Sequence, residues 1–188
     1  MKAVLALGVV AVLTLVGCDG SSGTEPSPAA APPPAQSATG SAALRVTSDA
    51  FTDGGRIPAA YTCTGGGRVP AIAWSGDLGE ATALAVVVDD PDAPGRTFVH
   101  RVVVDLPVTA SSLGADPPPG AREAKNSAGR TGWTPPCPPS GTHHYRFTVY
   151  GLRSPTGLPD GAAAADAIQA INARVLVQGR LVGLVSHS

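Results

Sequence analysis

The side chains that could carry chemistry in this chain are few, and they lie in three short segments. Asp90 and Asp92 follow one apolar run, and His100 lies inside the next. Each has an ordinary structural interpretation. Aspartates beside prolines are typical of a turn, and a single histidine among apolar neighbours is more often a core residue than a ligand. These residues indicate a site only if the fold brings them together with other polar groups.

The third segment joins a proline-rich stretch, 135–139, to His143 and Tyr145. Prolines stiffen the backbone that leads into this segment. If a strand has begun by His143, alternation places His143 and Tyr145 on one face and His144 and Arg146 on the other. An imidazole and a phenol side by side can both donate hydrogen bonds to an anion, and histidine titrates near neutral pH.

The elements that position these residues are predicted to be strands. Apolar runs rich in β-branched residues predict strands over 83–89, 97–106, 145–152 and 175–185, with shorter candidates at 44–47 and 71–74. Alternation along the second run places His100 and Arg101 on opposite faces. Gly179 and Gly183 are expected to weaken the last strand.

One helix is predicted over 162–174, with Asp160 as its capping residue. The segment 107–142 is rich in proline and glycine and predicts a long loop, which is uncommon in a compact domain unless the loop is functional. The predicted fold class is mainly β: an antiparallel β-sandwich with one or two peripheral helices.

The N-terminal segment has the features of an export signal. Lys2 precedes an apolar run that is too short for a bilayer, which needs about 20 residues, but has the length of a signal-peptide core. The run ends in Leu-Val-Gly-Cys, which resembles the bacterial lipoprotein box with Cys18 as the lipidated residue; the alternative is an ordinary cleaved signal with an incidental cysteine. We therefore expect a signal peptide at 1–17, a lipidated, disordered tether at 18–43 and a folded domain at 44–188. The expected location is the extracytoplasmic face of the cell membrane.

Two further cysteines, Cys63 and Cys137, lie in the domain. In an oxidising compartment they could form a disulfide, although two separate buried thiols are the alternative. There is no Cys-x-x-Cys sequence, so neither a thioredoxin-like motif nor a structural zinc site is indicated.

Charge and motif content argue against two classes of function. The net charge is −1, and no basic run provides the phosphate-neutralising surface that a nucleic-acid-binding protein needs. There is no Gly-x-Ser-x-Gly and no His-Glu-x-x-His sequence, which argues against the common hydrolase and metalloprotease classes. We expect a protein that is not an enzyme, with no metal and no cofactor.

Eight blocks of the domain, taken in order, resemble the phosphatidylethanolamine-binding protein family in its bacterial, Raf-kinase-inhibitor-like branch. The most specific pair is Asp-Pro-Asp-Ala-Pro from Asp90 and Pro-Pro-Ser-Gly-Thr-His from Pro138. The blocks are 51–58, 61–63, 70–74, 90–95, 99–100, 126–129, 136–139 and 141–147. The resemblance implies a large antiparallel sheet packed on a smaller one, with a small pocket for phosphate, phosphorylethanolamine or similar anions. By position its walls would be Asp90, Asp92, His100, Pro138, His143 and Tyr145.

The chain departs from the family pattern at two positions. Arg101 stands where the family usually has tryptophan, and His144 stands where it usually has arginine. The resemblance implies that this arginine braces the acidic residues of the pocket. Arg101 or Arg146 could take its place, but alternation directs Arg101 away from His100.

The function that these residues favour is binding of a small anionic ligand or phospholipid headgroup by a membrane-tethered domain. A carboxylate near an imidazole can orient it and favour its protonated form, so that a cationic donor meets the anion. Affinity is then expected to fall as the pH rises. The alternatives are a kinase or proteinase inhibitor acting through a protein partner, a hydrolase using the acid–histidine cluster, and a metal site formed by His100, His143 and an aspartate.

Overall fold

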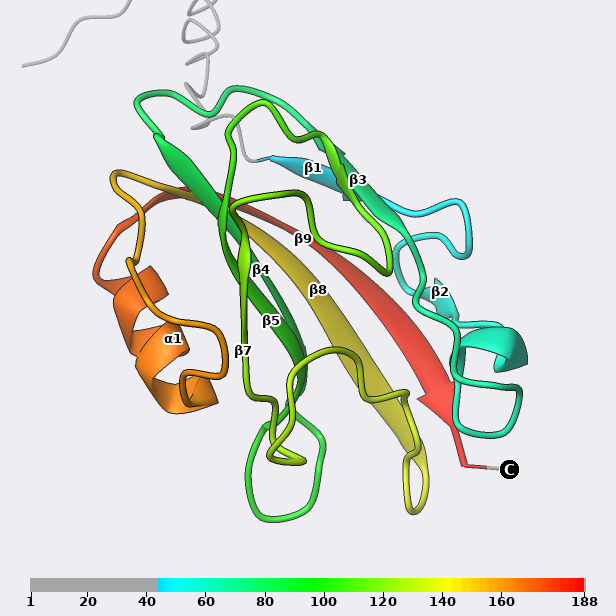
Figure 1. Ribbon diagram of the computed structural model, residues 1–188. Helices are drawn as coiled ribbons and strands as arrows, with labels where there is room; N and C mark the ends of the chain where they lie inside the picture. Colours follow the sequence, from blue (N-terminus) through cyan, green and yellow to red (C-terminus); the bar gives the residue numbers. More distant parts are fainter. Residues whose placement is uncertain (1–43, 188) are drawn as a thin grey trace, which may run out of the picture. The chain divides into compact units, whose positions relative to one another are not determined.

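The computed structural model describes residues 44–187, which form two stacked sheets and one α-helix (Figure 1). The smaller sheet has the order β1 (Arg45–Thr47), β3 (Ile72–Ser75), β6 (Ser112–Leu113). The larger sheet has the order β2 (Gly55–Arg56), β9 (Val175–Ser186), β8 (Thr142–Leu152), β4 (Ala83–Asp90), β5 (Phe98–Leu106), β7 (Arg122–Ala124). Only the β2–β9 pairing is parallel among these strands. The predicted antiparallel sandwich is therefore confirmed, while the signal peptide, Cys18 and the tether lie outside the described residues.

Both faces of the large sheet are covered, which explains why its central strands are almost continuously apolar. One face packs on the small sheet through a core that includes Trp74, Val86, Phe147 and Leu181. The other face carries the helix α1 (Ala164–Asn172) over a second cluster of buried residues, Val87, Val102, Val104, Ala167, Ile171 and others. No helix among residues 44–187 is long and apolar enough to cross a membrane.

A bulge in β5 changes which side chains face the small sheet. Val88 of β4 lies opposite Arg101, but the next residue of β4, Asp89, lies opposite Val99, so that His100 is an extra residue in β5. An extra residue shifts the alternation by one position. The ring of His100 contacts Tyr145 of the intersheet core, and Arg101 lines the space between the sheets, so both face the same side. The prediction that Arg101 points away from His100 is wrong.

The two glycines of β9 admit close neighbours. A Cβ at Gly179 would collide with the backbone carbonyl of Leu44, and one at Gly183 would collide with the side chains of Ile57 and Phe51. Glycine in a strand commonly marks such an approach. Although we expected these residues to weaken the strand, β9 runs unbroken over 12 residues beside β8.

Two local predictions also need correction. The segment 107–142 is not one loop, because β6 and β7 lie within it. The helix α1 begins after Ala163 without a side-chain cap, and Asp160 accepts a hydrogen bond from the backbone N–H of Glu123 instead (2.9 Å). A short 3-10 helix, η1 (Ala59–Tyr61), follows β2 and was not predicted.

Candidate functional site

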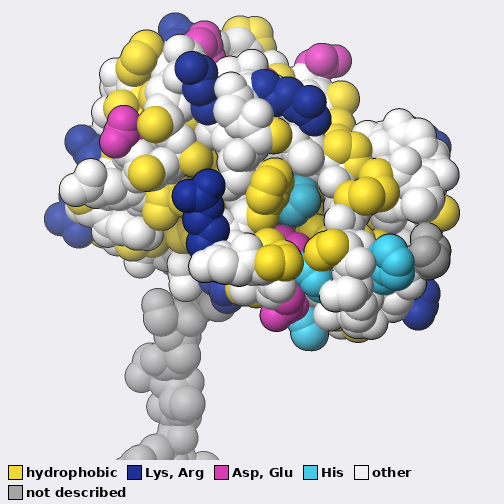
Figure 2. All heavy atoms as spheres, turned by 90° about the horizontal axis from the view of Figure 1, so that it is seen from below, with side chains coloured by type: hydrophobic (Ala, Val, Ile, Leu, Met, Phe, Trp, Pro, Cys, Tyr) yellow, Lys and Arg dark blue, Asp and Glu magenta, His cyan; other side chains and the backbone are white. Residues whose placement is uncertain are grey.

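The predicted polar residues gather at one end of the large sheet. The end of β4, the start of β5, the start of β8 and the proline-rich segment 135–139 meet there, at the bottom of Figure 1. Seen from that end, histidine and acidic side chains lie close together and partly beneath hydrophobic side chains (Figure 2). Antiparallel pairing of β4 with both β5 and β8 brings these ends of the strands to one edge.

The closest polar contact joins His143 and Asp90. His143 Nδ1 lies 2.6 Å from Asp90 Oδ2, and the two residues are only 6% and 3% exposed. The other carboxylate oxygen, Oδ1, accepts a hydrogen bond from the backbone N–H of Asp92 (2.9 Å). Because Asp90 is held at both oxygens, it fixes the imidazole with Nδ1 as a donor and leaves Nε2 for a ligand.

His100 is fixed in a different way. Its Nδ1 lies 2.7 Å from the carbonyl of Thr134, and a carbonyl only accepts, so Nδ1 carries the proton. Burial lowers the pKa of His100, although the hydrogen bond to Thr134 and the charge of Asp90 oppose this shift. The ring is therefore neutral at neutral pH, and Nε2 is a buried acceptor with no partner among the described residues.

Tyr145 contacts both imidazoles. Its ring centroid lies 5.2 Å from that of His100 and 6.5 Å from that of His143. Burial raises the pKa of the Tyr145 phenol, and the nearby Asp90 carboxylate raises it further. The hydroxyl group therefore remains a donor throughout the physiological pH range. Asp90, His100, His143 and Tyr145 form what we call the anion cluster.

Asp92 lies beside this cluster, but its carboxylate is bonded to His144. Its Oδ2 accepts hydrogen bonds from the backbone N–H of His144 (2.8 Å) and from His144 Nδ1 (2.7 Å). The first of these bonds is the main cause that lowers the pKa of Asp92. The position at which the resemblance implies an arginine thus still pairs with an acid of the site, but through an imidazole instead of a guanidinium.

Neither nearby arginine braces the acids of the cluster. Arg101 is buried and donates to Glu123 Oε1 (2.8 Å) and to the carbonyls of Gly114 (2.6 Å) and Ala115 (2.7 Å). Arg146 pairs with Asp89 on the face that carries α1. Neither arginine therefore takes the place of the family arginine, and Arg101 holds the loop before β7 instead.

A disulfide ties the proline-rich segment to the loop after η1. Cys63 and Cys137 are bonded with their Cα atoms 5.4 Å apart, which confirms the predicted pairing. The N–H of Cys63 also donates to the carbonyl of Pro136 (3.0 Å). The carbonyl of Pro138 accepts a hydrogen bond from His187 Nδ1 (3.0 Å), and Pro138 lines a cavity beyond the cluster. The structure thus places Pro138 in the wall of this cavity.

Sequence reasoning missed the residues that position His100. Buried Asn126 donates to the carbonyl of Gly132 (3.1 Å) and to Thr134 Oγ1 (3.0 Å), which shapes the turn that presents the Thr134 carbonyl. Trp133 packs near His100, with 6.1 Å between ring centroids. Block 126–129 was the available signal, since it belongs to the family resemblance, but nothing in it indicated a contact with His100.

The metal alternative receives no support from geometry. Within residues 44–187, no three His, Cys, Asp or Glu side chains are grouped so that they could hold a metal ion. Among the candidate ligands, His143 Nδ1 is engaged by Asp90 and His100 Nδ1 by a carbonyl.

The fold and the cluster together define a class of protein. The model of the family described as "Phosphatidylethanolamine-binding protein" matches residues 47–186, and the chain belongs to this family. "Putative lipoprotein LppC" from Mycobacterium tuberculosis is 40% identical, over 94% of this chain and 92% of its own length. A "UPF0098 protein" from Methanothermobacter thermautotrophicus is 37% identical over 75% of this chain and 97% of its own.

Two solved structures share the fold. A phosphatidylethanolamine-binding protein homologue from Chlamydia trachomatis, CT736, superposes with a TM-score of 0.71 at 31% identity. YbcL from Escherichia coli, described as a member of the mammalian family, gives 0.73 at 28% identity. Each match covers 99% of the solved chain and 78% or 77% of this one. Those chains consist almost entirely of this domain, so in both of them the fold forms without an added N-terminal segment.

Proposed function

We propose that the domain binds a small, phosphate-bearing anion at the anion cluster. The observation that carries this proposal is the buried hydrogen bond between His143 and Asp90, which lies beside Tyr145 at the edge of the sheet. A buried carboxylate and imidazole are costly to desolvate, and residues of this kind are found more often at functional sites. Family membership supports a ligand-binding role of this general kind.

The chemistry of the cluster suits an oxyanion. Protonated His143 offers an N–H at Nε2, and the Tyr145 hydroxyl offers a second donor. Hydrogen bonds from a cation to an oxyanion are among the strongest available to a protein. His100 offers an acceptor instead, which suits a ligand that carries a donor of its own, such as a phosphate hydroxyl or an ammonium group.

Binding fits the cluster better than catalysis does. Among the described residues, no serine, threonine or cysteine side chain is hydrogen-bonded to His100 or His143, so neither imidazole has a nucleophile to activate. Cys137, the thiol nearest in sequence to the cluster, is held in a disulfide. We therefore favour a binding protein that is not an enzyme and needs no cofactor.

We also propose that the domain is held at the extracytoplasmic face of the membrane by a lipid on Cys18. The support is the lipoprotein-like sequence that ends at Cys18 and the M. tuberculosis relative that is named as a lipoprotein. The disulfide fits an oxidising compartment. A tether would let the cluster reach headgroups or soluble phosphate compounds near the membrane.

Calorimetric titration of phosphorylethanolamine into oxidised residues 44–188 tests the binding proposal. His143→Ala is expected to lower the affinity at least tenfold at pH 6.5, because it removes the cationic donor. His187→Ala is the matched control, since this exposed histidine contacts no side chain of the cluster, and it should change the affinity less than twofold. If neither phosphorylethanolamine nor phosphate binds the wild type, the proposal fails and a protein-interaction role becomes the better hypothesis.

A further inference from the structure

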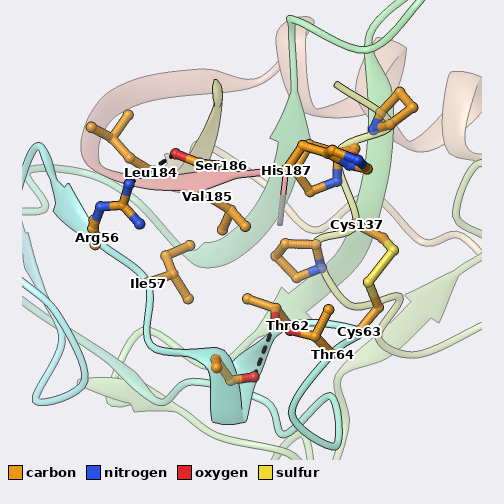
Figure 3. Close-up of a pocket in the computed structure, with 14 residues that line it drawn as sticks. Arg56, Ile57, Thr62, Cys63, Thr64, Cys137, Leu184, Val185, Ser186 and His187 are labelled. Atoms are coloured by element: carbon orange, nitrogen blue, oxygen red, sulfur yellow. Dashed lines mark hydrogen bonds between the residues drawn. A yellow bond between two sulfur atoms is a disulfide. The ribbon is translucent and has the colours of Figure 1, made fainter. Parts of the chain in front are cut away.

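A cavity lies beside the proline-rich segment, and none of its lining residues belongs to the anion cluster. Its volume is about 590 Å³, within the range of small-molecule pockets. It lies where β2 and the end of β9 meet the loop after η1 and the segment 136–139. Figure 3 shows Ile57 and Val185 at its centre, with Arg56 on one side and the Cys63–Cys137 disulfide on the other.

The interior of this cavity is apolar. Register places Ile57 next to Val185 on the face toward the small sheet, and both side chains belong to the buried core. Three prolines and the disulfide form the opposite wall, and the hydroxyl of Thr62 is already bonded to the carbonyl of Ala59 (3.0 Å). The walls therefore offer contact area but few free hydrogen-bonding groups, as an apolar chain requires.

The rim of the cavity is basic. None of its lining residues is acidic, whereas Arg56 and His187 both lie on it and both are exposed. Arg56 shares a sheet face with Leu184, so its guanidinium lies outside the apolar interior, where it donates to Ser186 Oγ (3.1 Å). Among the described residues no carboxylate pairs with Arg56. A cation outside an apolar pocket is complementary to an amphiphile with an anionic head.

We propose that this cavity binds a single-chain carboxylate amphiphile, such as a medium-chain fatty acid. The carboxylate pairs with Arg56 at the rim, and the alkyl chain occupies the space between Val185 and the prolines. This site is separate from the anion cluster and does not depend on the function proposed for the cluster.

Calorimetric titration of hexanoate, octanoate and decanoate into residues 44–188 tests the proposal. Affinity is expected to rise about fourfold for each added methylene group that enters the cavity. Arg56→Gln should weaken decanoate binding at least tenfold and leave phosphorylethanolamine binding unchanged, whereas His143→Ala should leave decanoate binding unchanged. Arg45→Gln is the matched control, because it removes the same charge from β1 of the small sheet and Arg45 does not line the cavity.

A cavity-filling variant provides a second criterion. Ala59 is an exposed residue of the cavity wall. Ala59→Phe should abolish the increase in affinity with the length of the alkyl chain, while thermal unfolding shows an intact domain. Equal affinities for hexanoate and decanoate would overturn the proposal, as would decanoate binding that is lost in His143→Ala but kept in Arg56→Gln. Absence of decanoate binding, together with dimer formation that Ala59→Phe abolishes, would assign the cavity to a second copy of the chain and also overturn it.

Discussion

His143 and Asp90 are joined by a 2.6 Å hydrogen bond although 53 residues separate them in the chain. The strands that carry them are neighbours, but register aligns Asp89 with Arg146, so the pair is diagonal and faces the intersheet side. Burying these groups costs free energy that an apolar pair would not. This cost is a reason to propose a ligand-binding role for the pair, and the proposal has consequences that can be measured.

The first consequence is a pH dependence of anion binding. Since Asp90 holds Nδ1 as a donor, Nε2 of His143 can donate only when the ring carries a proton on both nitrogens, and affinity for an anion is expected to fall as the pH rises from 5.5 to 8. Glycerophosphorylethanolamine is a suitable probe, because a phosphodiester keeps its charge in this range, whereas a phosphomonoester titrates near pH 6. Calorimetry at several pH values measures the affinity, and a constant affinity would contradict the mechanism.

Asp90→Asn separates the role of the carboxylate from that of the ring. Without the negative charge the hydrogen bond from His143 Nδ1 holds the ring less firmly, and affinity for the same probe at pH 6 is expected to fall about tenfold. Asp89→Asn is the matched control, since Asp89 is adjacent in sequence but pairs with Arg146 on the opposite face. Equal losses in both variants would show that long-range charge, rather than the His143 contact, is responsible.

Tyr145→Phe tests the second donor of the cluster. Because burial keeps the phenol protonated, the hydroxyl should contribute at all pH values up to 9, and its removal should weaken phosphate binding about tenfold at pH 6.5 and at pH 8. Tyr150→Phe makes the same change on the same strand beneath the helix, and it should have no effect. An unchanged affinity in Tyr145→Phe would remove this hydroxyl from the site.

The lowered pKa of His100 predicts a pH dependence of stability. The folded state holds His100 neutral, whereas the unfolded state binds a proton below about pH 6.5. The unfolded state then binds more protons, so the free energy of unfolding decreases as the pH falls from 7.5 to 5. Chemical denaturation should show a larger decrease in the wild type than in His100→Asn, and identical slopes would contradict the neutral, buried assignment.

The sequence was sufficient for those parts of the site that depend on regular alternation. His143 and Tyr145 share a face of β8 as predicted, because β8 has no irregularity over these residues. The sequence could not show which face of β5 carries Arg101. The bulge at His100 arises from pairing with β4, and the apolar pattern of β5 does not reveal it. The contact of Asp92 with His144 depends on a backbone N–H at the start of β8, which no pattern of side chains reveals.

Close contacts between segments that are far apart in the chain also could not be predicted from the sequence. Gly179 and Gly183 look like weak points when β9 is considered alone, and only the packing of Leu44 and Ile57 shows why glycine is needed. The Cys63–Cys137 pairing remained one of two alternatives until the fold brought the segments together. Fold class, by contrast, followed from the length and composition of the apolar runs.

Removal of the disulfide should reduce stability without unfolding the domain. The bond closes a loop between residues 74 apart in sequence, and chain entropy predicts a contribution of about 4 kcal/mol to the free energy of unfolding. The double variant Cys63→Ser, Cys137→Ser should lose about this amount in urea denaturation, and the reduced wild type should lose about as much. A loss below about 1 kcal/mol would contradict this expectation and would mean that residual structure already constrains the unfolded chain when the bond is absent.

Gly179→Ala is expected to be severely destabilising, because the added methyl group meets the backbone of Leu44, which cannot rotate away as a side chain could. Overpacking of this kind typically costs about 1–3 kcal/mol, and this site should lie at the upper end. Gly114→Ala is the matched control: a Cβ there meets nothing within 4 Å and the backbone is not in the left-handed region, so stability should change by less than about 0.5 kcal/mol. Denaturation of both variants measures the difference. If Gly179→Ala were as stable as Gly114→Ala, β1 would have to lie farther from β9 than the structure shows, and the small sheet would be less firmly attached to the large one.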